Sequence, residues 1–123
     1  MNKIPAIYQG KLDSLDEIKV SPLSRAYTFS DSIYEVIPYF DGVPLCFQMH
    51  MERLKLSLEM SGINVDMAVV QNEIQKLALE LSSKNGYVYF QISRGIDALR
   101  SHLYQDNLVA ERFGYAVTTE FPS

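Results

Sequence analysis

The chain has 123 residues, 47% of them hydrophobic and 21% charged, with a formal net charge of −4 at pH 7. This composition is typical of one folded domain, and the acidic balance argues against a nucleic-acid partner, which would need a basic face. No apolar run approaches the roughly 18–20 residues of a membrane span, and the N-terminus lacks an apolar signal core. The single cysteine, Cys46, excludes an internal disulfide. We therefore expect a cytoplasmic protein without a membrane partner, and Cys46 as a small core residue.

The first thirty residues predict short elements. Residues 6–12 read as a strand with a glycine turn, and residues 16–20 as a second strand. Residues 21–32 are rich in serine and contain a proline, which is typical of a loop with room for one helical turn.

A hairpin is the clearest local signal of the sequence. Residues 33–40 and 43–47 are β-rich and flank Asp41-Gly42, which favours a two-residue type I′ turn. Pro38 and Pro44 lack an amide hydrogen, so we expect parts of this hairpin at a sheet edge or a bulge.

Two helices are predicted after the hairpin. The first covers residues 48–60 and ends at Gly62, and the second covers residues 67–83 with Asp66 as its N-cap. We expect Asn85-Gly86 to end the second helix, whose apolar residues recur at helical spacing at Val70, Ile74, Leu77 and Leu81.

The last third of the chain returns to strands. Residues 87–95 have apolar residues on both faces of the predicted strand, which indicates a central buried strand. Residues 112–121 predict a final strand after a polar loop. The order of strands, two helices and strands predicts an α+β domain, in which two helices pack on one side of an antiparallel or mixed sheet.

Two pairs of residues could carry chemistry near the middle of the chain. Tyr34 and Glu35 lie where the hairpin begins, although a packed tyrosine and a solvated glutamate are the ordinary interpretation. His50 and Arg53 are three residues apart and so share a helix face, although the arginine stem can simply lie along apolar surface while its head stays in water.

Three further cationic positions follow in the second half. Arg94 ends the predicted central strand and could cap the sheet edge, whereas Arg100 and His102 suit an anionic ligand if they are more than loop charges. The chain has no glycine-rich phosphate loop, no HExxH and no paired cysteines. Two histidines and one cysteine are a poor ligand set for a structural zinc ion, so we expect no metal.

Taken together, these motifs resemble one family over nearly the whole chain. Arg25 is followed in order by the segments "FSDSIYEVI", "DG", "HMERLKLS", "YFQISRG" and "RSH". This series resembles the fold-type IV pyridoxal-phosphate (PLP) enzymes, and within them the D-amino acid aminotransferase branch.

The resemblance implies roles for named residues. Arg53 would bind the PLP phosphate, with His50 as a supporting neighbour, and Tyr34, Arg100 and His102 would bind the substrate carboxylate. In the family, the Arg-x-His pair acts in the partner subunit, which implies a homodimer. The implied substrates are a D-alanine-like amino acid and a 2-oxo acid.

The resemblance has three departures, and one is Ser24-Arg25-Ala26 where the family has Asp-Arg-Gly. Ser30-Asp31-Ser32 stands where the family usually has Gly-Asp-Gly, and glycine there would permit a positive φ. The length fits only the family's small N-terminal domain, over residues 1–120, with residues 121–123 as the start of a linker. The C-terminal domain that carries the Schiff-base lysine would then be absent. We therefore expect no catalytic residue in this chain, and an isolated chain that is inactive and self-associates.

Alternatives remain within and outside the enzyme class. Branched-chain aminotransferase and aminodeoxychorismate lyase share the family scaffold, but we do not expect them to carry the Arg-x-His pair in this form. From another class, a non-catalytic anion-binding or dimerisation module also fits the sequence.

Overall fold

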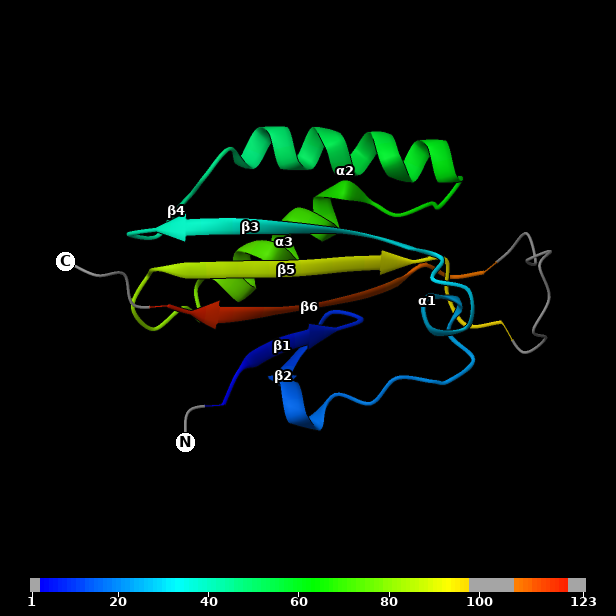
Figure 1. Ribbon diagram of the computed structural model, residues 1–123, viewed down its shortest axis with the longest axis horizontal. Coiled ribbons are helices and arrows are strands. Elements are labelled where there is room, and N and C mark those ends of the chain that lie inside the picture. The colour runs from blue at the N-terminus through cyan, green and yellow to red at the C-terminus, as the bar shows by residue number, and fades with distance from the viewer. Residues whose placement is uncertain (1–2, 98–107, 120–123) are drawn as a thin grey trace.

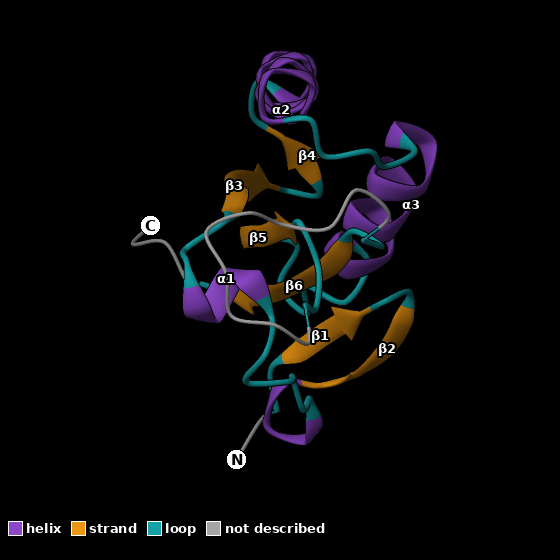
Figure 2. Cartoon of the chain, turned by 90° about the vertical axis from the view of Figure 1, so that its right-hand side faces the viewer, coloured by secondary structure: helices purple, strands orange, loops and turns teal. Residues whose placement is uncertain are grey.

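The computed structural model describes residues 3–97 and 108–119, which form a six-stranded antiparallel sheet in the order β2-β1-β6-β5-β3-β4. Helix α2 packs on β3, and α3 packs on β5, β6 and β1 (Figures 1 and 2). The predicted α+β class with two helices on one side of the sheet is confirmed. The elements are β1 (Pro5–Tyr8), β2 (Lys11–Ser14), the 3-10 turn η1 (Leu15–Glu17), α1 (Arg25–Thr28), β3 (Ser32–Phe40), β4 (Val43–Pro44), α2 (Phe47–Ser61), α3 (Met67–Ala78), β5 (Gly86–Ser93) and β6 (Glu111–Thr118).

The core lies between the sheet and these two helices, because successive strand residues point to opposite faces. Strand β5 is central, as predicted, with β3 and β6 as its neighbours. Its Val88, Phe90 and Ile92 are fully buried beneath the helices, whereas Tyr87 and Tyr89 on the other face are only partly covered. Gly114 on β6 allows α3 to come close, since a Cβ there would lie 3.0 Å from Leu77 Cδ1 and 2.7 Å from Phe90 Cδ2.

Two of the three predicted helix caps are found in the structure. The Asp66 side chain accepts a hydrogen bond from the Ala68 amide, and Gly62 ends α2 in the left-handed conformation with φ +69°. The predicted second helix is too long, because α3 ends at Ala78 and the chain continues in tight turns. Asn85 does not cap that helix; its side chain instead accepts a hydrogen bond from the amide of Asp41 in the hairpin turn.

The expected strand over residues 16–20 is wrong. Gln9 and Gly10 both have positive φ, 50° and 83°, so the chain reverses at once after β1. Strand β2 then pairs with β1 in a register that ends at Ser14 opposite Pro5. Pro5 is the first residue of β1, so β1 offers no further partner for β2 beyond Ser14, and the next residues form η1.

The hairpin turn is confirmed, but its second arm is short. Asp41 and Gly42 have φ of 51° and 80°, as a type I′ turn requires. Strand β4 has only two residues, because Pro44 cannot donate to a ladder and Cys46, with φ 54°, turns the chain into α2. The expectation that Cys46 is a core residue is wrong, since it is exposed at this turn.

Candidate functional site

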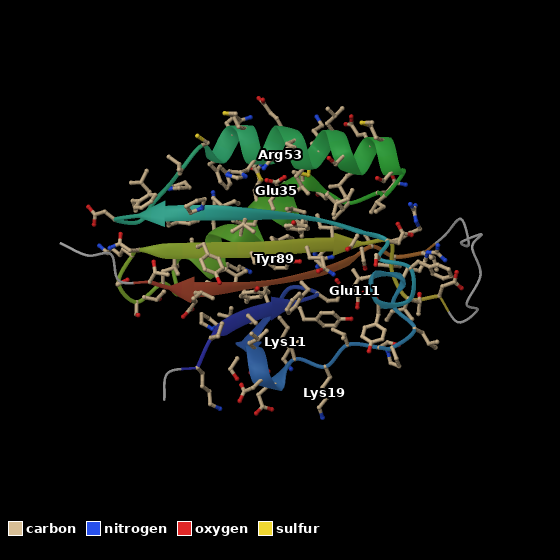
Figure 3. The ribbon with its side chains drawn as sticks, in the orientation of Figure 1. Lys11, Lys19, Glu35, Arg53, Tyr89 and Glu111 are labelled. Atoms are coloured by element: carbon tan, nitrogen blue, oxygen red, sulfur yellow. The ribbon has the colours of Figure 1, made fainter. Side chains whose placement is uncertain are left out.

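Arg53 on α2 and Glu35 on β3 form an ion pair with two hydrogen bonds, which lies between the helix and the strand (Figure 3). Arg53 Nε donates to Glu35 Oε2 at 2.8 Å, and Arg53 Nη2 donates to Glu35 Oε1 at 2.6 Å. Glu35 is 5% exposed, so the sequence-based interpretation of a solvated glutamate is wrong. The strand alternation that buries Ile37 also points Glu35 toward α2.

His50, one helical turn before Arg53, completes this group. Its Nδ1 lies 2.6 Å from Glu35 Oε1. Burial by itself raises the pKa of the Glu35 carboxyl, but hydrogen bonds from Arg53 and His50 outweigh it and lower that pKa below its ordinary value of 4.5. The carboxylate is thus ionised at neutral pH and can only accept, so His50 Nδ1 carries the proton that it donates.

The outer edge of the Arg53 guanidinium faces solvent. The side chain is 67% exposed, although its inner edge is bound to Glu35. In the part of the chain that the structure describes, Nη1 has no hydrogen-bond partner. A guanidinium held on one edge keeps a second edge that can donate to a phosphate or carboxylate.

A shallow groove of about 410 Å³ begins one helical turn from Arg53. Between β3 and the end of α2 it is lined by Ser32, Ile33, Tyr34, Ser57, Met60 and Ser61. Ser57 is four residues after Arg53 and therefore lies on the same face of the helix. The groove is thus lined by three serines and one tyrosine, and its Ser57 connects it along the helix face to the exposed Arg53 cation.

Tyr34 lies on the opposite face of β3 from Glu35 and is 59% exposed. Its ring stacks on Tyr89 with centroids 5.5 Å apart, and Tyr89 stacks on Tyr115 at 5.0 Å. Burial, together with these two neighbours, raises the pKa of Tyr89, which keeps its phenol protonated. Sequence reasoning missed Tyr89, although the strand register that places it beside Tyr34 follows from the hairpin and the central strand.

Arg94 does more than cap the sheet edge. Its Nε donates to Asp31 Oδ2 at 2.7 Å, and its Nη2 donates to the carbonyl of Ser61 at 2.8 Å. Arg25 Nε binds the same Asp31 oxygen at 2.9 Å, so two arginines share one carboxylate.

Ser30, where the family usually has glycine, takes φ 52° itself. The predicted substrate residues Arg100 and His102 lie outside the described residues, so their placement stays a prediction.

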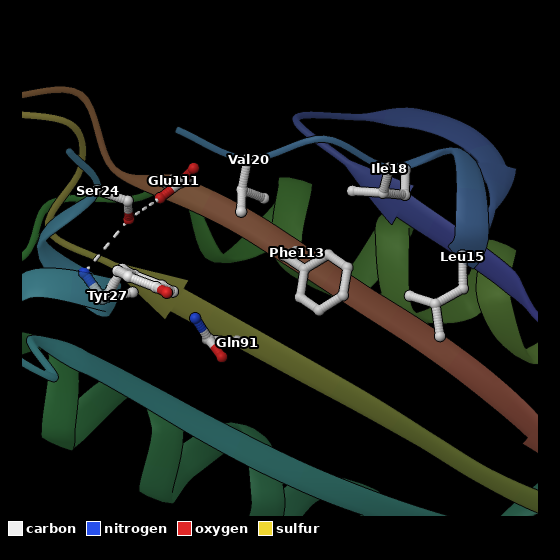
Figure 4. A pocket seen from close by; sticks show the side chains of 9 residues that line it. Leu15, Ile18, Val20, Ser24, Tyr27, Gln91, Glu111 and Phe113 are labelled. Atoms are coloured by element: carbon white, nitrogen blue, oxygen red, sulfur yellow. Dashed lines mark hydrogen bonds between the residues drawn. The ribbon is translucent and has the colours of Figure 1, made fainter. Parts of the chain in front are cut away.

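A second buried carboxylate, Glu111, lies beside a different hollow of about 380 Å³ (Figure 4). Glu111 is 6% exposed and accepts hydrogen bonds from the hydroxyls of Tyr8, Ser24 and Ser93. The three hydroxyl donors lie on β1, on β5 and in the segment before α1. Glu111 therefore connects these elements, and its buried carboxylate is not available to a ligand. The apolar side chains that line the hollow include Leu15, Ile18, Val20 and Phe113.

Other kinds of site are absent from the described residues. No group of three or more His, Cys, Asp or Glu side chains among residues 3–97 and 108–119 could hold a metal ion. Within the same residues, no helix has the length and apolarity needed to cross a membrane. Lys55, Lys76 and Lys84 are exposed, and so are the three N-terminal lysines.

Known proteins share this fold and parts of this sequence. D-alanine aminotransferase of Bacillus licheniformis is 28% identical over 118 residues, which are 94% of this chain and 41% of that protein. A branched-chain amino acid aminotransferase from Escherichia coli superposes with a TM-score of 0.84 at 16% identity, over 96% of this chain and 42% of that one. The 4-amino-4-deoxychorismate lyase of Pseudomonas aeruginosa gives 0.81 at 19% identity, over 95% and 41%.

The chain therefore spans about two fifths of the length of these proteins. The two solved structures establish the likeness in fold. The family model described as Amino-transferase class IV matches residues 32–123, which include β3, both long helices, β5 and β6. This match covers most of the sequence, and the chain belongs to the class IV aminotransferase family.

Proposed function

We propose that residues 1–120 are the small domain of a PLP-dependent aminotransferase and that Arg53 binds the cofactor phosphate. The observation that carries this proposal is the outer guanidinium edge of Arg53, exposed one helical turn from the groove at Ser57 while Glu35 holds the inner edge. A planar fork of donors suits a phosphate better than a single ammonium does. A branched-chain amino acid aminotransferase of this fold, solved with pyridoxamine 5'-phosphate, supports the choice of cofactor. When bound, PLP supplies the electron sink for cleavage at the substrate Cα.

The residues of this chain would bind and orient the substrate. Tyr34, whose ring is fixed by stacking on Tyr89, would donate its phenol to the substrate carboxylate, together with Arg100 and His102. The Arg-x-His pair would act in the partner's site of a homodimer. All six lysines of the chain are exposed, and a lysine that attaches the cofactor must be desolvated, so we place that lysine in a second domain.

A D-alanine-like amino acid and a 2-oxo acid are the substrates we propose. The supporting observations are the "YEV" and "RSH" segments and the similarity to D-alanine aminotransferases, of which the protein of Staphylococcus haemolyticus is 34% identical over 99 residues. The complete reading frame should form pyruvate from D-alanine and 2-oxoglutarate. Activity confined to L-leucine or to 4-amino-4-deoxychorismate would instead assign the branched-chain aminotransferase or the lyase.

The phosphate contact can be tested on this chain. PLP and pyridoxal differ by the phosphate, so tighter binding of PLP measures that contact directly. Arg53→Ala should lower PLP affinity about tenfold or more, because a charge-assisted contact is lost, and should leave pyridoxal binding unchanged. Lys55→Ala removes a cation from the same helix on another face and is the matched control.

Three results would contradict parts of this proposal. Equal PLP affinity in the native chain and Arg53→Ala would remove Arg53 from the site. Borohydride reduction of the chain with PLP, followed by mass spectrometry, should find no stoichiometric lysine adduct. One such adduct with measurable transamination would show that this chain carries its own cofactor lysine. Anion binding without turnover by the complete reading frame would favour the non-catalytic module.

A further inference from the structure

We propose that Glu35 is a positioning residue, which fixes the Arg53 guanidinium so that its outer edge is presented to a phosphate. This inference rests on the proposed function, because it assumes that a phosphate binds at Arg53. It gives a role to Glu35, which the sequence named only as one of a pair that could carry chemistry and to which the resemblance gave no role. Its physical basis is a rigid buried acceptor beneath a long, exposed and otherwise flexible side chain.

The geometry fixes the plane of the guanidinium. Arg53 donates one hydrogen bond to each oxygen of the Glu35 carboxylate, from Nε at 2.8 Å and from Nη2 at 2.6 Å. Two parallel bonds define both the position and the orientation of a planar group, whereas a single bond would leave rotation about its axis. The remaining edge, formed by Nη1 and the second hydrogen of Nη2, must then point away from β3.

Glu35 itself is held firmly. It lies on β3 opposite Phe90 of the central strand β5, and the residue is 5% exposed. His50 Nδ1 donates to the same carboxylate at 2.6 Å from the preceding turn of α2. The two donors from α2 and the pairing with β5 leave the carboxylate little freedom.

Holding Arg53 in advance matters for affinity. A free arginine has to lose side-chain freedom when it binds a ligand, at a cost that corresponds to about a two- to tenfold loss of affinity. A pair that already exists in the ligand-free chain removes this cost. The hydrogen bonds that lower the pKa of Glu35 keep the acceptor ionised at neutral pH.

A positioning role and a simple charge effect of Glu35 predict opposite changes in phosphate affinity when Glu35 is replaced. Glu35 is a negative charge near the expected phosphate, so its removal should strengthen anion binding if charge alone mattered. If orientation matters more, Glu35→Gln should weaken phosphate binding although the site gains positive charge. A glutamine has one acceptor oxygen and cannot reproduce the fork.

The test follows the Arg53 Nε–Hε signal of the 123-residue chain by nitrogen-15 NMR during titration with inorganic phosphate. In the native chain this signal should exchange slowly with water and shift on phosphate addition. Glu35→Gln should move it to the position of a solvated arginine and weaken phosphate binding about two- to tenfold. Glu35→Asp, which keeps the charge but is one methylene shorter, should also weaken binding.

Glu59→Gln is the control, since it makes the same change in charge at an exposed position of α2. It should not weaken phosphate binding or move the Arg53 signal. Unchanged or tighter binding in Glu35→Gln would overturn the positioning role and leave the phosphate site standing. A solvated Arg53 signal in the native chain would overturn the positioning role without any variant. A native chain that shows an ordered Arg53 but no response to phosphate would overturn the proposed phosphate site, on which this inference rests.

Discussion

Two arginine–glutamate pairs tie a helix to a strand on the same face of the sheet, and they differ in where the arginine lies. In the first, Arg53 on α2 binds Glu35 on β3, and the arginine side chain is 67% exposed. In the second, Arg112 on β6 binds Glu73 on α3, with side chains 20% and 4% exposed. Both carboxylates are buried, but the Arg53 side chain is far more exposed to solvent than the Arg112 side chain.

The comparison separates a structural tie from a binding group. Arg112 Nε donates to both oxygens of Glu73, at 2.8 and 3.1 Å, and the Arg112 side chain is only 20% exposed. Glu73 depends on this one partner in the described part of the chain, whereas Glu35 also receives a hydrogen bond from His50. The second pair should therefore matter more for stability, and the first more for ligand binding.

The largest expected effect is on stability, from Arg112→Ala. This substitution leaves the buried Glu73 carboxylate without a cation, which should lower the free energy of unfolding by about 3–5 kcal/mol. Arg53→Ala should lower it by clearly less, because His50 still donates to Glu35. Urea unfolding of the two variants at pH 7 gives the comparison. Equal destabilisation would show that the exposed pair is as structural as the buried one.

A smaller effect is expected when acid protonates Glu35 and removes its contribution to stability. The pKa of Glu35 lies below its unfolded value of about 4.5, so its stabilising contribution is present above that pH. The contribution is lost as the pH falls through the lower, folded pKa. The stability difference between the native chain and Glu35→Gln should thus be constant near neutral pH and shrink below pH 4.5. A difference that persists unchanged at the lowest pH would contradict an ionised Glu35 in the fold.

The smallest expected effect concerns Glu111, a buried carboxylate that accepts hydrogen bonds from hydroxyl groups. Burial, then the hydrogen bond and charge of Glu111, raise the pKa of Tyr8 to about 12. The protonated phenol therefore contributes stability below pH 10, and this contribution is lost as the pH rises through about 12. Tyr8→Phe should remove one late-titrating phenol from an absorbance titration at alkaline pH. Loss of a phenol that titrates near pH 10 would place Tyr8 in solvent instead.

The candidate site was predictable in part. His50 and Arg53 stand out because a histidine and an arginine share a face of an amphipathic helix. Their partner was missed, although Glu35 occupies the same parity of β3 as Ile37, which is an inward position. A charged residue at an inward strand position requires a cation, and that rule would have indicated Glu35 from the sequence.

The errors in the fold arose where backbone conformation overrides side-chain pattern. Cys46 stands in a β-rich, apolar run, but it adopts a left-handed conformation because the chain must turn from β4 into α2. The strand expected at residues 16–20 failed because the turn at Gln9 sets where β2 must end. Apolar composition alone does not report either constraint.

The sequence by itself determined the elements whose signals are local. Asp66, Gly62 and the Asp41-Gly42 turn act through bonds and φ angles within a few residues, so they could be placed without a fold. The order of those elements, with the series of short motifs, was also enough to indicate the family.

Only the tertiary structure decided which distant groups meet. Glu35 and Arg53 are 18 residues apart, and Tyr34 and Tyr89 come from strands separated by two helices. Their contacts depend on how α2 packs on β3 and on the register of β3 with β5. Burial in that packing makes Glu35 a fixed acceptor rather than a solvated charge, because a carboxylate removed from water must find donors.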